Sequence, residues 1–190
     1  MANDKKIVEE SVLFESEAKS KSGEPYLKVL NYKYADDTDY TFARRVYKDS
    51  VKFVLVDTKK KLIGVLDSVK PIKEEIAMMY DVFGESLDEP NEERLKGLSR
   101  GLIEEAGYNP ETVTYRKVGE FLLSSSMDEV ATLYLVDIAK ATKTKRALEE
   151  GEVDHVTVWL DKESDILNKC SSLVQTAYLH LKTSISFSMK

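Results

Sequence analysis

Short runs of hydrophobic residues, rich in β-branched and aromatic side chains, recur through the first half of the chain. They predict four strands, at residues 26–34, 41–48, 51–57 and 62–67. The polar run DTKKK between the last two predicts a turn. Apolar residues then recur at helical intervals from about residue 91 to residue 106, and Gly107 is the type of residue that ends a helix.

The second half of the chain repeats this order. Strands are predicted at residues 113–123, 131–139 and 153–160, and one long helix from Asp161 to about Lys182. Because no Pro-rich or Ser-rich linker and no internal repeat interrupts the chain, we expect one domain with a decorated N-terminus. The order of strands, helix, strands and helix predicts an α+β sandwich in which helices flank a mixed sheet.

Composition narrows the class of protein. With 190 residues, 42% of them hydrophobic and 33% charged, the chain can form one well-packed globular domain. Its net charge of -6 argues against a nucleic-acid binder, whose affinity depends on clustered Lys and Arg. The sequence has no segment typical of a signal peptide, no run of about 20 apolar residues, and one cysteine, Cys170. We therefore expect a cytoplasmic protein that has no internal disulfide and no membrane partner.

The helix predicted at residues 91–106 carries the charged residues that suggest chemistry. Glu104 and Glu105 are adjacent near its end, and carboxylate oxygens suit a hard divalent cation such as Mg²⁺. Arg100 lies one helical turn before Glu104 and two turns after Glu92, so one guanidinium could hold the acids in register. Taken alone, two acids in a helix also fit a solvated helix face.

The order of these residues resembles a known signature. The stretch PNEERLKGLSRGLIEEAGY is similar to the motif of the Nudix hydrolases. In that motif Glu is followed after seven residues by Arg-Glu, an aliphatic residue, any residue, Glu-Glu, any residue, Gly and a hydrophobic residue. The flanking stretches KDSVKFVLVD, VLDSVKP, SSSMDE and LEEGEVDHVTVWL resemble the ADP-ribose and nucleoside-diphosphate-sugar pyrophosphatase branch of that family. The resemblance implies a Nudix-type α/β/α sandwich, with a catalytic-type domain at residues 49–190 and an N-terminal β extension at residues 1–48.

The resemblance also implies roles for individual residues. Metal ligands would be Glu104, Glu105 and the backbone carbonyl of Phe83, with Mg²⁺ or Mn²⁺ as the ion. The catalytic residues would be Glu105, Glu150 and Glu152, and the helix would be braced by Glu92 and Arg100. Substrate would be bound by Arg45, Lys70, Asp81 and Glu129. Together they would direct a metal-polarised water at the pyrophosphate of ADP-ribose or a related nucleotide sugar.

Position 101 departs from the motif, because it is Gly where the family has Glu. In the family the missing acid lies one helical turn before Glu105 and shares its metal. We therefore expect fewer ions or weaker binding unless a water or an acid at residues 149–152 fills the gap. Lys70 stands in place of a binding arginine, and the loop SSSM lacks the family's glycines. Two interpretations stay open: a divergent hydrolase, or a Nudix-fold protein that binds a nucleotide or a protein partner with little or no turnover.

The stretch YLKVLNYKYADDTDYTFARR is long for an isolated hairpin. It resembles the N-terminal strands that this branch exchanges across a two-fold axis, which implies a homodimer. The alternative is a small extra sheet on a monomer.

Overall fold

The computed structural model describes residues 6–19, 23–46, 49–72, 75–87, 93–124, 127–146, 156–184, 187 and 189. Within them, ten strands join in one mixed sheet. The strands are β1 Ile7–Glu15, β2 Leu27–Tyr34, β3 Asp39–Arg45, β4 Asp49–Asp57, β5 Leu62–Ile72, β6 Glu75–Asp81, β7 Phe83–Ser86, β8 Thr114–Ser124, β9 Met127–Asp137 and β10 Thr157–Leu160.

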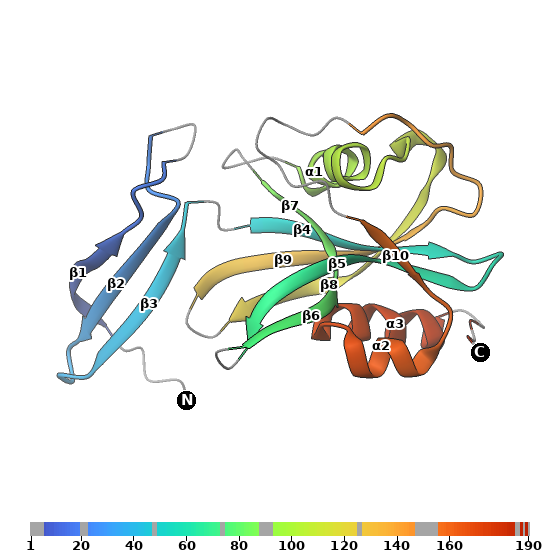
Figure 1. Ribbon diagram of the computed structural model, residues 1–190. Helices are drawn as coiled ribbons and strands as arrows, with labels where there is room; N and C mark the ends of the chain where they lie inside the picture. Colours follow the sequence, from blue (N-terminus) through green and yellow to red (C-terminus); the bar gives the residue numbers. More distant parts are fainter. Residues whose placement is uncertain are drawn as a thin grey trace.

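The sheet is mixed because β4 runs parallel to β9 while most other neighbours are antiparallel. Its main order is β1-β2-β3-β9-β4-β5-β10, with β6 paired to β5, β7 to β4 and β8 to β9. Strands β1, β2 and β3 stand beside the rest of the molecule (Figure 1). In the backbone pairing of the sheet, Ala43 of β3 lies beside Met127 of β9.

Helices cover both faces of the main sheet, as expected for an α/β/α sandwich (Figure 1). The helical elements are α1 Arg94–Gly101, the π-helical turn η1 Leu102–Ala106, the short 3-10 turn η2 Pro110–Thr112, α2 Glu163–Lys169 and α3 Ser172–Ser184. Helix α1 lies on one face, and α2 and α3 lie on the other. In the described part of the chain, no helix combines the length and the apolar character needed to cross a bilayer.

Strand β4 is the buried centre of the sandwich, and its sequence SVKFVLV explains why. Side chains alternate between the two faces of a strand. Phe53 and Leu55 therefore join the cluster under α1, whereas Val54 and Val56 join the cluster under α3. Lys52 lies two residues before Val54 and faces the α3 side, so this face of β4 begins polar and becomes apolar further along.

Most of the predicted strands are present, with ends shifted by a few residues. The strands that sequence patterns missed are β1, β6 and β7. Strand β1 is exposed at every position and pairs with β2. The composition of the stretch FGESLDEP, before the predicted helix, is typical of a turn. A turn is the wrong prediction for its first four residues: Phe83–Ser86 form β7, because the free edge of β4 accepts them in antiparallel register.

The prediction of one long helix from Asp161 to about Lys182 was also wrong, because this segment forms two helices, α2 and α3. Cys170 is extended, with φ -104° and ψ 154°, and separates α2 from α3. The break comes from contacts with β6: the N–H of Ser171 donates to the carbonyl of Tyr80 at 2.9 Å, and the Ser171 hydroxyl donates to Asp81 at 2.6 Å. Two hydrogen bonds to the sheet replace the continued helical ladder.

The predicted helix at residues 91–106 is described from Arg94 onwards, and its second half is not α-helical. Residues Leu102–Ala106 form a π turn, whose hydrogen bonds skip one residue more than in an α-helix. Gly107 ends this element in the left-handed conformation, with φ 67°, as the sequence predicted. The π turn carries Glu104 and Glu105, so their spacing from Gly101 is not the single α-helical turn assumed from the sequence.

Candidate active site

The sheet splits where β5 leaves β4. Strand β5 pairs with β4 over three residues near Gly64 and then pairs with β6, while β7 takes over the edge of β4. A cavity of about 490 Å³ lies at this split. It is lined by Lys52, Leu66, Asp81, Val82, Gly84, Glu105, Phe121, Leu122, Leu123, Ser171, Ser172, Leu173 and Thr176. Residues from both helical layers therefore meet there.

Glu105 reaches this cavity from the π turn η1. Its Oε2 accepts a hydrogen bond from the backbone N–H of Gly84 at 2.8 Å. This bond joins the end of the α1–η1 element to strand β7. A charge-assisted hydrogen bond from a backbone donor holds a carboxylate in one orientation, so Glu105 is the best positioned of the predicted acids.

Lys52 enters the same cavity from β4, directly opposite Gly84 in the strand pairing. A Cβ on Gly84 would lie 2.5 Å from Lys52 Cδ and 2.6 Å from its Nζ. The lysine side chain thus passes over the glycine through space that any other residue would fill. Sequence reasoning missed Lys52, although a lysine in the apolar run VKFVLVD is a signal that could have found it.

Arg100 binds strand β7. Its guanidinium donates to Glu85 Oε1 at 3.1 Å and to the carbonyl oxygen of Ser86 at 2.5 Å. The sequence predicted that Arg100 would brace the acidic helix in partnership with Glu92, which lies outside the described residues. In the described structure Arg100 braces the helix against the neighbouring strand, through an acid that the sequence did not single out.

Gly101 faces the same strand. A Cβ at this position would lie 3.1 Å from the Phe53 ring and 3.3 Å from the Cβ of Glu85, both closer than ordinary contact. The helix glycine therefore has a packing reason. The space beside it is filled by Glu85 of β7, a residue that sequence analysis did not consider for this gap.

Asp81 lies at the end of β6, on the wall of the cavity. Its Oδ1 accepts hydrogen bonds from the Ser171 hydroxyl at 2.6 Å and from the backbone N–H of Val82 at 2.9 Å. Asp81 was predicted to contact substrate, and the structure places it in the cavity wall, where it also connects β6 to the start of α3.

Arg45 and Glu129, both predicted to bind substrate, contact each other. Arg45 Nη1 lies 2.6 Å from Glu129 Oε2, and the Ser50 hydroxyl donates to Glu129 Oε1 at 2.8 Å. Burial opposes ionisation of Glu129, but the hydrogen bonds from Arg45 and Ser50 and the nearby charge of Lys52 outweigh it and lower the pKa of this carboxyl. The ion pair ties β3 of the N-terminal strands to β9 and β4 of the main sheet.

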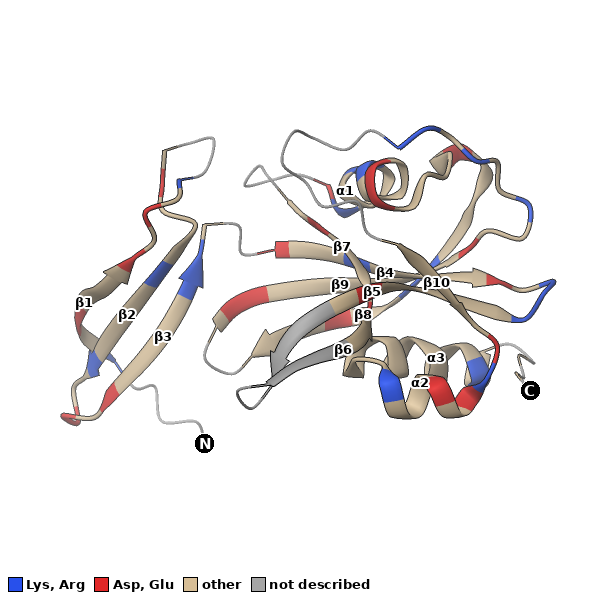
Figure 2. Cartoon of the chain, in the orientation of Figure 1, with Lys and Arg blue, Asp and Glu red and all other residues tan. Residues whose placement is uncertain are grey.

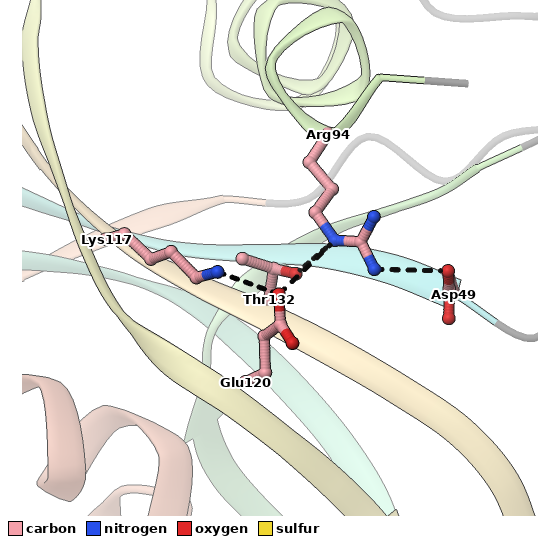
Figure 3. A network of polar contacts seen from close by, with 5 residues as sticks. All are labelled: Asp49, Arg94, Lys117, Glu120 and Thr132. Carbon is pink, nitrogen blue, oxygen red and sulfur yellow. Dashed lines mark hydrogen bonds and ion pairs between the residues drawn. The ribbon is translucent and has the colours of Figure 1, made fainter. Parts of the chain in front are cut away.

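A second polar network fixes the start of α1 (Figure 3). Arg94 donates to the Thr132 hydroxyl at 2.8 Å and to Asp49 at 3.2 Å, and lies 3.7 Å from Glu120. Lys117 in turn donates to Glu120 at 2.7 Å. The hydrogen bonds from Lys117, with the charges of Lys117 and Arg94, lower the pKa of Glu120 despite a small opposing effect of desolvation. This network sets the position of the helix that carries Glu105, and no sequence signal pointed to it.

Of the remaining predicted site residues, the structure describes the side chains of Phe83 and Glu104. Phe83 is fully buried, and its ring stacks on Phe53 with centroids 5.1 Å apart. Glu104 is half-buried beside Glu105 on the π turn. Lys70 belongs to β5, opposite Ala77, and its side chain lies outside the described part of the structure. The predictions for Glu92, Glu150 and Glu152 fall on residues outside the described ranges.

Carboxylate oxygens of Glu104 and Glu105 are donors of the kind that Mg²⁺ and Mn²⁺ prefer. Among the described residues, no group of three or more Asp, Glu, His and Cys side chains is arranged to hold a metal ion. The described donors thus fit such an ion in chemical type but do not complete a site. The other acids predicted from the sequence, Glu92, Glu150 and Glu152, lie outside the described residues.

Comparisons with known proteins bear on the fold. No protein-family model and no curated protein matches the sequence. The structure is similar to a crystal structure described as an ADP compounds hydrolase, with a TM-score of 0.56 and 14% sequence identity. The likeness covers 94% of this chain and 95% of that chain. It confirms the expected fold class, a mixed sheet with few helices in an α+β arrangement.

Proposed function

We propose that this protein is a metal-dependent pyrophosphatase of the Nudix type. It would cleave ADP-ribose or a related nucleoside diphosphate sugar into a nucleoside monophosphate and a sugar phosphate. The observation that carries this proposal is the Glu105 carboxylate, which Gly84 N–H orients at a cavity of about 490 Å³. The fold shared with an ADP compounds hydrolase supports the same class of substrate.

In this proposal each described residue has a task. Glu105 and Glu104 would hold the ion, and Arg100 keeps their helix against β7 through its bonds to Glu85 and Ser86. When bound, Mg²⁺ or Mn²⁺ supplies a polarised water and neutralises charge on the bridging oxygens of the substrate. Asp81 lines the same cavity, where its carboxylate would accept a hydrogen bond from a sugar hydroxyl of the substrate.

The direct test is Glu105→Gln, which retains an amide oxygen for the Gly84 hydrogen bond but removes the charge. We expect release of AMP from ADP-ribose to fall at least about 100-fold, the usual effect of losing one essential catalytic group. The exposed Glu111→Gln is the matched control and should keep full activity. An unchanged rate in Glu105→Gln, with the same dependence on Mg²⁺, would contradict the proposal.

A second function is favoured by one observation: position 101 carries no carboxylate, and a side chain there would crowd Phe53 and Glu85. With one acid fewer, the protein would bind a nucleotide without cutting it. Thermal stabilisation by ADP-ribose without formation of AMP, in both Mg²⁺ and Mn²⁺, would favour this alternative over the enzyme.

The proposed assembly is a homodimer formed through the N-terminal strands. Strand β1 is exposed at all positions, and Val8, Val12 and Phe14 are each more than half exposed, at 55%, 53% and 53%. An exposed apolar edge strand is a template for pairing with another chain, here a second copy. Light scattering after gel filtration should give twice the mass of one chain.

A matched pair of variants separates the dimer from the monomer. Val12→Glu places a charge on β1 and should lower the measured mass to that of one chain. Leu167→Glu places the same charge on an exposed leucine of α2, at 45% exposure, and should leave the mass unchanged. A parent chain that is monomeric at micromolar concentration would rule out this assembly.

A further inference from the structure

We infer that Lys52 is the phosphate-binding cation of the cavity and that Gly84 is the residue that admits its side chain there. The inference deepens the proposed function and rests on it for the identity of the ligand, a diphosphate that carries a nucleoside. The binding of such an anion is measured separately from its hydrolysis.

The position of Lys52 within β4 is unusual for a lysine. Its neighbours Val51 and Phe53 are buried at 0% exposure, and Lys52 itself is half-buried. A half-buried charge costs free energy unless it is paired or hydrogen-bonded. Among the described residues, no carboxylate lies within ion-pair distance of its ammonium group, so a structural ion pair does not explain this lysine.

The acids near Lys52 are occupied by other groups. Glu129 feels its charge but is bonded directly to Arg45 and Ser50. Asp81 accepts hydrogen bonds from Ser171 and Val82, and Glu105 accepts one from Gly84. The acids thus have donors of their own, and the ammonium is the cationic group that the cavity presents to an incoming anion.

Gly84 makes the path of the lysine possible. Strand β7 pairs with β4 so that Gly84 lies opposite Lys52. A Cβ at position 84 would come within 2.5 Å of Lys52 Cδ, a separation that real side chains do not adopt. Glycine in a strand interior is unfavourable and often marks the close approach of another group. Here the approaching group is the lysine chain, and the same residue donates its N–H to Glu105.

The rest of the cavity indicates what accompanies the phosphate. Leu122 and Leu123 of β8 are 60% and 37% exposed, and they line the cavity together with Leu173 of α3. Apolar side chains beside a cation and several hydroxyl groups suit a ligand that is charged at one end and flat or apolar at the other. A nucleoside diphosphate meets this description better than inorganic pyrophosphate does.

The experiment is calorimetric titration with ADP and with inorganic pyrophosphate, each in EDTA and in Mg²⁺. Lys52→Met should weaken ADP binding about tenfold or more, because a hydrogen bond to a charged group is lost. Lys52→Arg keeps the charge and should restore most of the affinity. Tighter binding of ADP than of pyrophosphate would support the apolar wall as a nucleoside contact, and the reverse order would overturn that part.

Two further variants test whether ADP binding depends on the position of the Lys52 side chain as well as on its charge. Gly84→Ala keeps every charge but displaces the flexible end of Lys52, so ADP binding should weaken in the same direction as in Lys52→Met. Lys59→Met removes a lysine from the basic turn between β4 and β5 (Figure 2), seven residues further along the chain and beyond the end of β4, and should leave binding unchanged. If Gly84→Ala does not fold, the comparison of Lys52→Met with Lys52→Arg still tests whether Lys52 binds the phosphate.

The outcomes distinguish this inference from the proposed function. If the parent chain binds ADP but forms no AMP, and Lys52→Met loses this binding, the inference stands and the proposed pyrophosphatase activity is ruled out. Turnover of ADP-ribose with the same KM in the parent and in Lys52→Met overturns the inference and leaves the enzyme standing. Absence of measurable binding of ADP and pyrophosphate by the parent overturns the inference outright.

Discussion

Gly101 of helix α1 and Glu85 of strand β7 lie against each other. A Cβ on the glycine would come within 3.3 Å of the Cβ of Glu85. The absence of a side chain at position 101 lets the strand bring its own carboxylate up to the helix, where Arg100 binds it at 3.1 Å. The glycine at position 101, where the Nudix signature that the sequence resembles has Glu, is therefore coupled to Glu85 across from it.

Restoring the motif by Gly101→Glu should destabilise the protein. The new side chain would overpack Phe53 and place a second negative charge beside Glu85, at a cost of about 1–3 kcal/mol. Urea unfolding measures this change, and Gly101→Ala should show a smaller loss. The double variant Gly101→Glu with Glu85→Ala should recover part of the stability, because the effects of two substitutions on the free energy of unfolding are not additive when the residues are in contact. A more stable Gly101→Glu single variant would contradict this account.

Removal of Arg45 tests the link between the N-terminal strands and the main sheet. Arg45→Met would leave the Glu129 carboxylate, whose side chain is 5% exposed, without its cation. We expect the free energy of unfolding to fall by about 1–3 kcal/mol, the cost of removing one partner of a buried polar group, because Arg45 itself is 37% exposed and Ser50 still donates to Glu129. Arg116→Met, on β8, provides a control in which an exposed arginine is removed and little stability should be lost. Equal stability of both variants would show that the pair is not a structural link.

The same carboxylate predicts a pH dependence. Since the pKa of Glu129 is lowered in the folded state, the folded chain binds fewer protons at this site than the unfolded chain does. Its contribution to stability is complete above the unfolded pKa of about 4.3 and is lost as the pH falls through the lower, folded value. Urea unfolding from pH 6 down to about pH 3 should show this loss. Glu129→Gln should be less stable at neutral pH, with a flatter profile; an unchanged profile would refute the assignment.

Cys170 should be chemically inert in the folded protein. Burial, with smaller effects from Asp165 and Asp81, raises the pKa of its thiol to about 12. Because the thiolate is the reactive form, iodoacetamide at pH 8 should leave the native chain unmodified and label it fully in urea. Mass spectrometry after timed quenching provides the measurement. Labelling of the native chain at the rate of a free thiol would show that the site opens.

Several elements could be predicted because their signal is local. The apolar run of β4 predicts a strand in any context, and Gly107 predicts a helix end because it adopts the left-handed conformation that other residues avoid. Strand β7 could not be predicted, since FGES contains a glycine and two polar residues in four positions. Its pairing with the free edge of β4 supplies the hydrogen bonds that its own sequence does not specify.

The breaks in the two helices also lacked a local signal. Residues 161–182 contain no Gly or Pro that would predict a break. The helix ends at Cys170 because Ser171 donates hydrogen bonds to Asp81 and Tyr80 of β6. The stretch LIEEA consists of good helix formers, yet it forms a π turn. Both departures depend on partners distant in the sequence, which local propensity does not contain.

The sequence by itself determined the fold class and the order of acids, because hydrophobic periodicity and residue spacing are properties of the chain. The tertiary structure decided which groups meet at the cavity: Glu105 with Gly84, Lys52 over Gly84, and Glu85 beside Gly101. These contacts join residues up to 32 positions apart in the sequence. They exist because β7 pairs with β4 where β5 leaves it, and that choice of partner is a balance of hydrogen bonds and packing over the whole sheet.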